Sequence, residues 1–449
     1  MHSSPLAAAP LLATVLLLAG PSAVAQERVT DINASGDAAP GWLAIVDEVL
    51  YFRADDGIFG EEVWRYDADI DMTVRLTDIN MAGDSEPAFL TAYDGDLYFE
   101  AELPGIGDRL YRYDPDTGAV AVVHPGDAEE LVVLGEVLYF GSEDAEHGFE
   151  LWRYDAATGS AERLTDINEG PAGSGVREMA GYQGKLYFSA DDGLGPGSNG
   201  LNAELWRYDP ATGVVEQVAD ISRGGNAFPE SLTVLGDKLY FEANDGGFSD
   251  KLWRYDAATD VTESISSFGT GPAAIESLSY MTVYNGQLYM QAEGRPSTFA
   301  QRVGWELYRF DPADDSAHLV ADINPGDASS DSFPARLTEY NGVLYFYADD
   351  GTHGVELWSH DGATGATVMV ADINPGAGSS YTASSFVSRF GAPVVLDGEF
   401  YFRADDGSTG SELWRLGTAV RDPDRVFRSG FEPVAAAAAA SGPPEHQGF

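Results

Sequence analysis

The chain has 449 residues and no cysteine, and its 73 Asp and Glu against 25 Lys and Arg give a formal net charge of −48. This charge disfavours nucleic acid, whose binding depends on clustered Lys and Arg, and anionic membrane surfaces. Without cysteine there are no disulfides and no thiolate chemistry, so an exported protein of this composition must be stabilised by its core, by metal or by both. Cations and extracellular glycan or protein partners are therefore the partners we expect.

Residues 1–25 are typical of a secretory signal peptide. Leu11–Ala19 is an apolar segment, and Ala23-Val24-Ala25 has the small-x-small form of a cleavage site. The apolar segment is short for a membrane span, and no later segment is a candidate. We expect cleavage after Ala25 and a secreted, periplasmic or cell-surface protein, monomeric and without a membrane span.

One motif then recurs eight times: an LYF-type strand, a loop rich in Gly and Asp, and an ELWRYD-type strand. The LYF-type strands begin at Leu50, Leu97, Leu138, Leu186, Leu239, Leu288, Leu344 and Phe400. The ELWRYD-type strands carry an aromatic anchor at Trp64, Tyr111, Trp152, Trp206, Trp253, Tyr308, Trp358 and Trp414. Short strands that recur about every fifty residues predict a propeller or a linear array of repeats.

The seventh unit shows four strands most clearly. Their expected ranges are Arg336–Tyr340, Val343–Ala348, Glu356–His360 and Thr367–Ile373. Asn341-Gly342 between the first two is a strong hairpin signal. Large apolar residues alternate onto both faces of these strands, so each sheet must be covered on both sides. Four antiparallel strands joined by short turns are the composition of one propeller blade.

The ends of the repeat region complement each other. The eighth unit stops at Glu412–Leu416 without a fourth strand, whereas Arg28–Asn33 reads as an isolated copy of that strand. We expect the N-terminal strand to complete the last blade, because ring closure removes exposed strand edges. The prediction is an all-β, eight-bladed propeller over residues 26–417. Residues 418–449 would form a disordered tail or a sorting or anchoring peptide.

The motif resembles that of the bacterial ELWxxDGT-repeat (hyalin-repeat-like) exported proteins. The best matches are Gly351–Trp358 with Asp372–Ser380, and Gly407–Trp414. The chain departs from the family after ELW, where RYD-x-x-TG usually replaces xxDGT. The resemblance implies a propeller-like exported protein and implies no chemistry. Arg425–Glu432 likewise resembles a short C-terminal peptide of some exported bacterial proteins.

Acidic loops provide the first candidate site. Four loops between the second and third strands of a unit carry paired aspartates, and all should lie on one face of the ring. The pairs are Asp55 and Asp56, Asp191 and Asp192, Asp349 and Asp350, and Asp405 and Asp406. Carboxylate pairs near other oxygen ligands suit Ca²⁺. The alternative is structural, since Asp-Gly sequences build turns with the Asp side chain capping local amides.

A second candidate is a loop that breaks the repeat. In the sixth unit, Glu293–Gly304 replaces the Asp-Asp-Gly sequence and holds Arg295 and Arg302 beside Trp305. Arg with an aromatic residue is a reasonable contact for a sugar or a carboxylate, whereas an ordinary long loop is the competing interpretation. Other irregular loops are Glu102–Asp108, Gly193–Ala203 and Pro375–Phe390, the last with Tyr381. Loops on a rigid scaffold are where binding residues concentrate.

The Glu that precedes Leu-Trp or its equivalent in six of the eight units is expected to be scaffold, paired with a nearby Arg across strands. Sequence signatures of hydrolase, zinc-protease, phosphate-binding and dinucleotide-binding sites are missing. We therefore predict an exported, non-catalytic binding or structural propeller with an acidic loop face that binds Ca²⁺ or a cationic or glycan ligand. The alternative is a carbohydrate-active enzyme, a glycoside hydrolase or lyase, with carboxylates on the propeller face.

Overall fold

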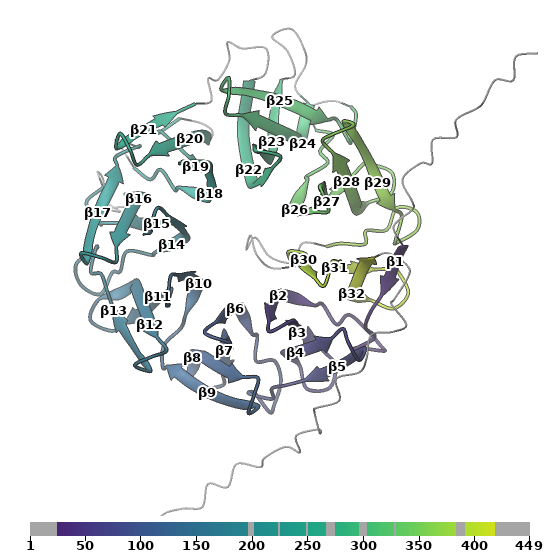
Figure 1. Cartoon of the computed structure of the whole chain (residues 1–449), viewed down its shortest axis with the longest axis horizontal. Coiled ribbons are helices and arrows are strands. Elements are labelled where there is room, and N and C mark those ends of the chain that lie inside the picture. Colours follow the sequence, from purple (N-terminus) through teal and green to yellow (C-terminus); the bar gives the residue numbers. More distant parts are fainter. Residues whose placement is uncertain are drawn as a thin grey trace, which may run out of the picture.

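The computed structural model describes residues 25–195, 202–222, 225–247, 250–265, 274–295, 303–326, 329–382 and 391–417. Every regular element in these ranges is a β-strand, and the strands form eight four-stranded antiparallel sheets arranged in a ring (Figure 1). The predicted eight-bladed β-propeller is therefore confirmed. No helix in the described ranges is long and apolar enough to cross a bilayer.

The blades follow the repeat units in order. Blades 1 and 2 comprise β2 (Gly41–Val46), β3 (Val49–Asp55), β4 (Glu61–Asp67), β5 (Met72–Arg75), β6 (Ala88–Tyr93), β7 (Asp96–Leu103), β8 (Gly107–Asp114) and β9 (Ala119–His124). Blades 3 and 4 comprise β10 (Glu129–Leu134), β11 (Val137–Asp144), β12 (Gly148–Asp155), β13 (Ser160–Arg163), β14 (Arg177–Tyr182), β15 (Lys185–Asp191), β16 (Ala203–Asp209) and β17 (Val214–Ala219).

Blades 5 and 6 comprise β18 (Glu230–Leu235), β19 (Lys238–Ala243), β20 (Lys251–Asp256), β21 (Val261–Ser264), β22 (Ala274–Tyr284), β23 (Gln287–Arg295), β24 (Val303–Asp311) and β25 (Ser316–Ala321). Blades 7 and 8 comprise β26 (Ala335–Tyr340), β27 (Val343–Asp349), β28 (Val355–Asp361), β29 (Ala366–Ala371), β30 (Val394–Leu396), β31 (Glu399–Asp405), β32 (Ser411–Gly417) and β1 (Ala25–Arg28). In each blade the first strand lies nearest the ring centre (Figure 1).

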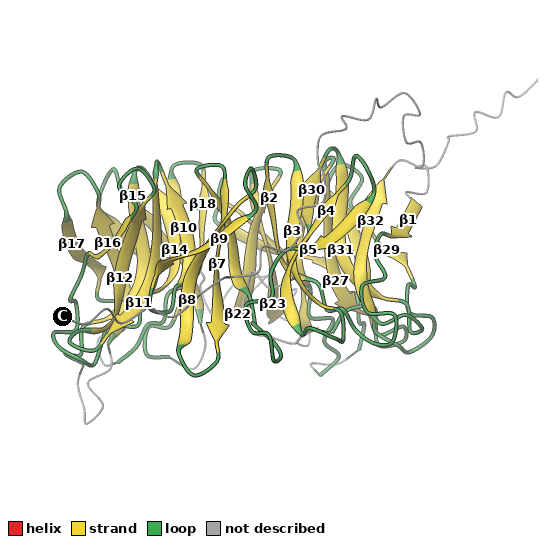
Figure 2. Cartoon of the chain, turned by 90° about the horizontal axis from the view of Figure 1, so that it is seen from below, coloured by secondary structure: helices red, strands yellow, loops and turns green. Residues whose placement is uncertain are grey.

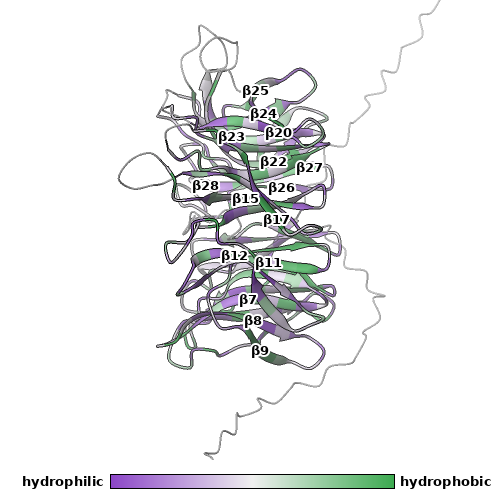
Figure 3. Cartoon of the chain, turned by 90° about the vertical axis from the view of Figure 1, so that its left-hand side faces the viewer, coloured by the Kyte–Doolittle hydropathy of each residue, from purple (hydrophilic) through white to green (hydrophobic). Residues whose placement is uncertain are grey.

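The core lies between blades. Leu50 and Phe52 pack with Tyr401 and Leu413 of blade 8, whereas Tyr51 packs toward blade 2. The LYF strand therefore presents large side chains to both neighbours, as its alternation predicts, and full burial of such a side chain contributes roughly 1.5–3 kcal/mol. Hydrophobic residues follow the strands through the disc (Figure 3), and loops cover its two rims (Figure 2).

The ring closes through the N-terminal strand, but a few residues earlier than expected. β1 is Ala25–Arg28 and pairs antiparallel with β32, with Gln26 opposite Leu416. Glu27 also forms an ion pair with Arg415 at 2.6 Å. The N-terminal strand thus completes the last blade as predicted, but it spans Ala25–Arg28 and not the expected Arg28–Asn33. Residues from Thr30 onward leave the sheet because their polar groups bind a buried carboxylate.

That carboxylate belongs to the Glu that precedes Leu-Trp. Its six copies are all 0% exposed: Glu62, Glu150, Glu204, Glu306, Glu356 and Glu412. Each accepts hydrogen bonds from backbone amides of the DIN-type segment that follows the fourth strand. Glu412, for example, accepts from Thr30 Oγ1 at 2.7 Å and from the Ile32 amide at 3.1 Å. The expected cross-strand pairing with Arg is therefore wrong, because the partner of each carboxylate is a turn and not a cation.

This contact fixes which loops share a rim. The buried Glu joins the start of the third strand to the crossover that leads into the next blade, and backbone bonds reinforce it, such as Ser85 N to Glu61 O at 3.0 Å. The loops between second and third strands therefore lie beside the crossovers, as predicted. The paired aspartates gather on this rim, called here the crossover rim.

Candidate functional site in the central channel

The paired aspartates of the crossover rim build turns. Asp55 Oδ1 accepts from the Gly57 amide at 2.7 Å, and Asp56 Oδ1 accepts from the amides of Ile58 and Phe59 at 2.9 and 2.8 Å. The same contacts recur at the other three pairs, Asp191 and Asp192, Asp349 and Asp350, and Asp405 and Asp406. Such side-chain caps explain why Asp recurs in these loops.

Ca²⁺ binding by these loops stays a prediction. Within the described ranges, no group of three or more His, Cys, Asp or Glu side chains is placed to hold a metal ion. Two aspartates of neighbouring DIN segments pair with arginines: Asp31 with Arg28 at 3.2 Å and Asp78 with Arg75 at 3.4 Å.

Of the three predicted ligand-binding residues, Trp305 lies in a cavity. Arg302 is outside the described residues, and Arg295 is described only as the backbone end of β23. Trp305 precedes the buried Glu306, and its backbone is held by the crossover through Asp331 Oδ1 at 2.8 Å and the Ser332 amide at 2.9 Å. The backbone of Trp305 is thereby fixed to the crossover between blades 6 and 7.

The cavity around Trp305 has a volume of about 420 Å³ and a largely aromatic wall. It is called here the aromatic cavity. Its wall includes the rings of Tyr280, Trp305, Phe333, Tyr347 and Tyr381, together with the amide of Gln291. These residues come from blades 6 and 7 and from the crossover into blade 8, the irregular segment that the sequence singles out.

Tyr381 is the best-held ring of this wall. It stacks on Tyr347 with ring centroids 4.1 Å apart and an interplanar angle of 15°. Its hydroxyl accepts a hydrogen bond from Arg336 Nε at 3.1 Å. Tyr347 in turn donates to the carbonyl of Arg403 at 2.7 Å. The wall is therefore preorganised before a ligand arrives, which lowers the entropic cost of binding.

A repeated backbone irregularity shapes the channel wall nearby. In seven blades the innermost strand carries a β-bulge whose first residue has a positive φ, between 53° and 58°. These bulge residues are Trp42, Phe89, Glu130, Glu178, Ser231, Tyr280 and Arg336. The left-handed region is costly for residues with a Cβ, by roughly 1–2 kcal/mol. A bulge re-aims side chains, and strained backbone tends to cluster at functional sites.

The bulge position keeps its backbone while its side chain changes from blade to blade. The same position holds three aromatics, two acids, one Ser and one Arg, whereas the LYF positions scarcely change. Sequence reasoning missed these residues, although a signal exists: each lies eight residues before the first residue of its LYF-type strand. Invariant spacing with a variable side chain separates this position from the scaffold.

A second variable position lies one residue after LYF. Its occupants are Arg53, Glu100, Gly141, Ser189, Glu242, Gln291, Tyr347 and Arg403. Most of these side chains are buried between blades: Glu100 is 8% exposed, Glu242 is 6% and Arg403 is 5%. Gln291 and Tyr347 reach the aromatic cavity, so this position forms a layer behind the bulge residues.

The two positions divide the ring by charge. Blades 2–5 supply Glu100, Glu130, Glu178 and Glu242, whereas blades 7, 8 and 1 supply Arg336, Arg403 and Arg53. Burial, followed by the carboxylates of Asp108 and Glu129, raises the pKa of Glu100 to about 8. Burial and then the neighbouring Glu230 raise the pKa of Glu242 well above its usual value. Their surroundings therefore disfavour the ionised form of both carboxyl groups.

Comparisons with known proteins support the fold alone. Neither protein-family models nor curated proteins match the chain. Among solved structures it is similar to a prolyl endopeptidase, at 10% identity and a TM-score of 0.53, over 83% of this chain and 53% of that one. The chain thus spans about half the length of that peptidase. The chain is also similar to a puromycin hydrolase mutant, at 14% identity and a TM-score of 0.44, over 86% of this chain and 61% of that one. An oligogalacturonate lyase in complex with manganese gives the same identity and TM-score, over 72% of this chain and 85% of that one. The resemblance to ELWxxDGT-repeat proteins stays a prediction.

Proposed function

We propose that the protein is an exported, non-catalytic binding propeller that holds a glycan in the aromatic cavity. The observation that carries the proposal is the composition of that cavity. Five aromatic rings and an amide meet there, and all of them occupy positions that vary between blades or lie in crossovers. A role in building the repeated scaffold therefore does not explain why these six side chains are there.

A sugar fits this wall chemically. One face of a sugar ring is lined with C–H groups, which pack on aromatic rings, and its edge carries hydroxyls that need hydrogen-bond partners. Trp305 and Tyr280 offer aromatic surface, and Gln291 offers both a donor and an acceptor. A concave site with mostly apolar walls and few polar groups is the usual form of a small-ligand pocket.

The test is a screen of the mature chain on immobilised oligosaccharides, followed by titration of the best ligand. We expect Trp305→Ala to weaken binding by about tenfold or more, because a buried aromatic contact is worth at least about 1.4 kcal/mol. Phe228→Ala is the control, because Phe228 is an aromatic residue of the crossover into blade 5, is 43% exposed and does not line the cavity.

Two results would count against the proposal. One is that no oligosaccharide is retained by the wild-type chain. The other is that Trp305→Ala and Phe228→Ala bind the retained oligosaccharide as well as the wild type does. Both variants remove one large side chain from the crossover rim, so their comparison separates loss of a contact from loss of stability.

A carbohydrate-active enzyme is the second candidate, favoured by Glu100 of blade 2, which does not line the aromatic cavity. Burial raises the pKa of this carboxyl group to about 8, which favours the protonated form that a general acid needs. Incubation of the retained oligosaccharide with wild type and Glu100→Gln, with the release of reducing ends as readout, tests it. Product that forms only with the wild type supports an enzyme, and intact oligosaccharide in both samples supports the binding function.

A further inference from the structure

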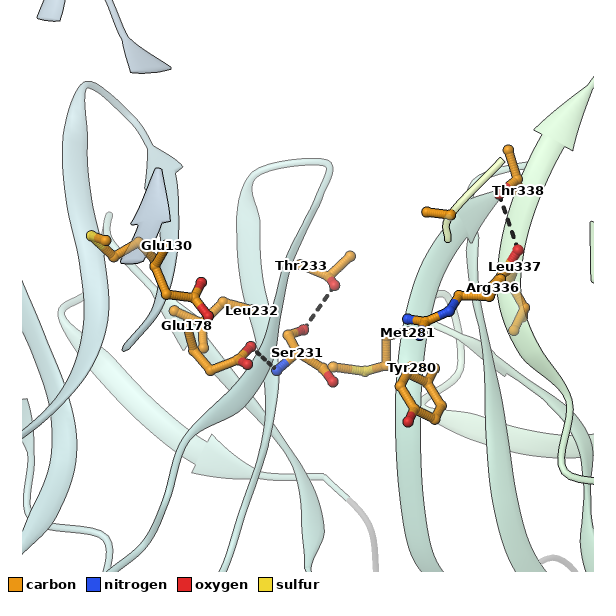
Figure 4. A pocket seen from close by; sticks show the side chains of 12 residues that line it. Glu130, Glu178, Ser231, Leu232, Thr233, Tyr280, Met281, Arg336, Leu337 and Thr338 are labelled. Atoms are coloured by element: carbon orange, nitrogen blue, oxygen red, sulfur yellow. Dashed lines mark hydrogen bonds between the residues drawn. The ribbon is translucent and has the colours of Figure 1, made fainter. Parts of the chain in front are cut away.

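The central channel holds a second cavity, of about 220 Å³, whose wall includes bulge residues of blades 3 to 7. Polar side chains of this wall are held by the wall itself. Glu178 accepts a hydrogen bond from the Ser231 amide at 2.9 Å (Figure 4). Thr338 donates to the Arg336 carbonyl at 3.0 Å, and Arg336 Nε donates to Tyr381 at 3.1 Å. These contacts give the wall a structural role, so it does not call for a ligand of its own.

Exposed apolar side chains on the crossover rim of blades 1 and 2 are a different case. They are Ile58, 79% exposed, Phe59, 41%, Met81, 89%, and Ile106, 58%. The first two lie in the loop between β3 and β4, the third in the crossover into blade 2, and the fourth in the loop between β7 and β8. These four residues are called here the apolar patch. A contiguous group of exposed apolar side chains marks an interaction surface.

The three segments of the apolar patch are bonded to one another. The Ser85 amide of the crossover donates to the Glu61 carbonyl, at the end of the first loop, at 3.0 Å. The Glu102 amide, at the start of the second loop, donates to the Ser85 carbonyl at 2.8 Å. The crossover thus lies between the two loops, which brings the four apolar side chains to one region of the rim.

The fold of the first loop does not require Ile58 and Phe59. Asp56 caps their amides at 2.9 and 2.8 Å. In blade 8 the equivalent loop keeps the same cap on the amides of Ser408 and Thr409, also at 2.9 and 2.8 Å. The same turn is therefore built with polar side chains elsewhere in the ring. Two large apolar residues in water are unfavourable, and the turn gives no reason for them.

The surroundings of the apolar patch narrow down its occupant. Exposed carboxylates on or beside the same segments are Asp78, Asp84, Glu86 and Asp108. Arg75 pairs with Asp78 and lies over the Phe59 ring at 3.8 Å from its centroid. A second copy of this rim would bring like charges together, which disfavours a dimer through this face. The occupant that fits is an apolar segment flanked by basic residues.

The chain contains such a segment after the propeller. Arg425-Val-Phe-Arg428 sets two apolar residues between two arginines, and Phe431 follows. β32 runs from Ser411, whose amide bonds to the crossover into blade 1, to Gly417 at the opposite rim. Phe427 is ten residues beyond Gly417. Ten extended residues span up to about 35 Å, more than the roughly 23 Å of a strand as long as β32, so the segment can return to the crossover rim of neighbouring blade 1.

We propose that Arg425–Phe431 binds the apolar patch of its own propeller, with Phe427 against Ile58 and Phe59 and the arginines beside the carboxylates. Attachment to the same chain gives the segment an effective concentration on the order of millimolar, so a weak contact is enough to populate the bound state. Burial of apolar surface supplies the contact, and the opposite charges fix its direction. The docking does not depend on glycan binding.

The experiment uses the mature full chain, residues 26–449, with a photoreactive benzophenone analogue of phenylalanine in place of Phe427. Irradiation, followed by electrophoresis and peptide mass mapping, shows what the analogue touches and whether the contact lies within one molecule. We expect crosslinks within the monomer to the segments that carry the apolar patch, which are residues 56–60, 80–83 and 103–107.

Two double variants separate the apolar contact from the charges. Ile58→Ser with Phe59→Thr takes the residues of the equivalent blade-8 loop and should lower the yield of these crosslinks at least about threefold. Arg425→Gln with Arg428→Gln leaves the propeller unchanged and should lower the yield at low salt as well. Leu194→Ser is the control, because Leu194 is 82% exposed in the corresponding loop of blade 4. It should leave the yield unchanged.

Several results would overturn the proposal. Crosslinks only elsewhere on the propeller, only between two molecules, or none at all would show that the segment does not dock on its own apolar patch. An unchanged yield in both double variants, or an equal loss in Leu194→Ser, would show that the contact does not depend on the apolar patch or on the arginines.

Discussion

Glu100 offers the sharpest test of the buried acidic layer. The proposed change is Glu100→Gln, which keeps shape and hydrogen-bonding capacity and removes the charge. Gln291 already occupies the same repeat position in blade 6, where it is 6% exposed, so an amide fits there. The groups that act most strongly on Glu100, apart from burial itself, are the carboxylates of Asp108, Glu129 and Asp127.

The magnitude follows from linkage. Folding raises the pKa of Glu100 from its usual 4.5 to about 8, so the native state holds the proton more tightly than the unfolded chain does. The contribution of this proton binding to the free energy of unfolding is fully present below pH 4.5 and is lost as pH rises from 4.5 to about 8. Because one pH unit corresponds to about 1.4 kcal/mol, the total is about 5 kcal/mol. For about 390 residues this equals roughly 6 °C in melting temperature.

The assay is calorimetric melting of wild type and Glu100→Gln between pH 4.5 and 9. We expect the two chains to melt within about 1 °C of each other at pH 4.5, and the variant to melt about 6 °C higher at pH 9. A difference that does not change with pH would refute the reasoning, because only an ionising group can produce the trend. A variant that is less stable at every pH would show that Glu100 contributes through its contacts instead.

Three further predictions concern the scaffold and the rim. Gly354→Ala should lower the melting temperature at least twice as much as Gly365→Ala. Both glycines have φ above 70°, but a Cβ on Gly354 would meet the Gly378 carbonyl at 2.5 Å, whereas a Cβ on Gly365 has nothing within 4 Å. Equal losses would show that the backbone around Gly354 can shift to accept the added methyl group. Deletion of Gln26–Arg28 should lower the melting temperature by several degrees and promote association in size-exclusion chromatography, because β32 becomes an exposed strand edge. A monomeric chain with an unchanged melting temperature would mean that closure of the ring does not depend on β1. If the paired aspartates bind Ca²⁺, millimolar Ca²⁺ should raise the melting temperature relative to EDTA, and Mg²⁺ at equal ionic strength should not. The same melting temperature in Ca²⁺, Mg²⁺ and EDTA would show that these aspartates only build turns.

The fold could be predicted because it repeats. The alternation of Leu50, Tyr51 and Phe52, found again in every unit, implies sheets covered on both faces, and the unpaired ends imply closure. The bounds of the closing strand could not be predicted. Thr30 and the residues after it look like strand, and only the buried Glu412 draws their amides out of the sheet.

The site was predicted only in part, for a related reason. Trp305 was found because its loop departs from the repeat, and it lines the aromatic cavity. Glu178 and Arg336 sit inside strands that appear regular in the sequence, and the bulge that turns them toward the channel depends on how strands pair. The predicted pairing of the Glu before Leu-Trp with an Arg was wrong, because a charged residue beside Trp was expected at the surface. Its actual partners are backbone amides in the buried interior, and the sequence does not indicate them.

The central claim is that the ligand lies at the variable positions of the channel wall and not at the repeated loops of the crossover rim. A crystal structure of the mature chain soaked with the oligosaccharide that it retains most tightly tests this most directly. We predict sugar rings against Trp305 and Tyr280 in the aromatic cavity. Sugar bound only at the outer Asp-Gly loops, with the channel empty, would contradict the account.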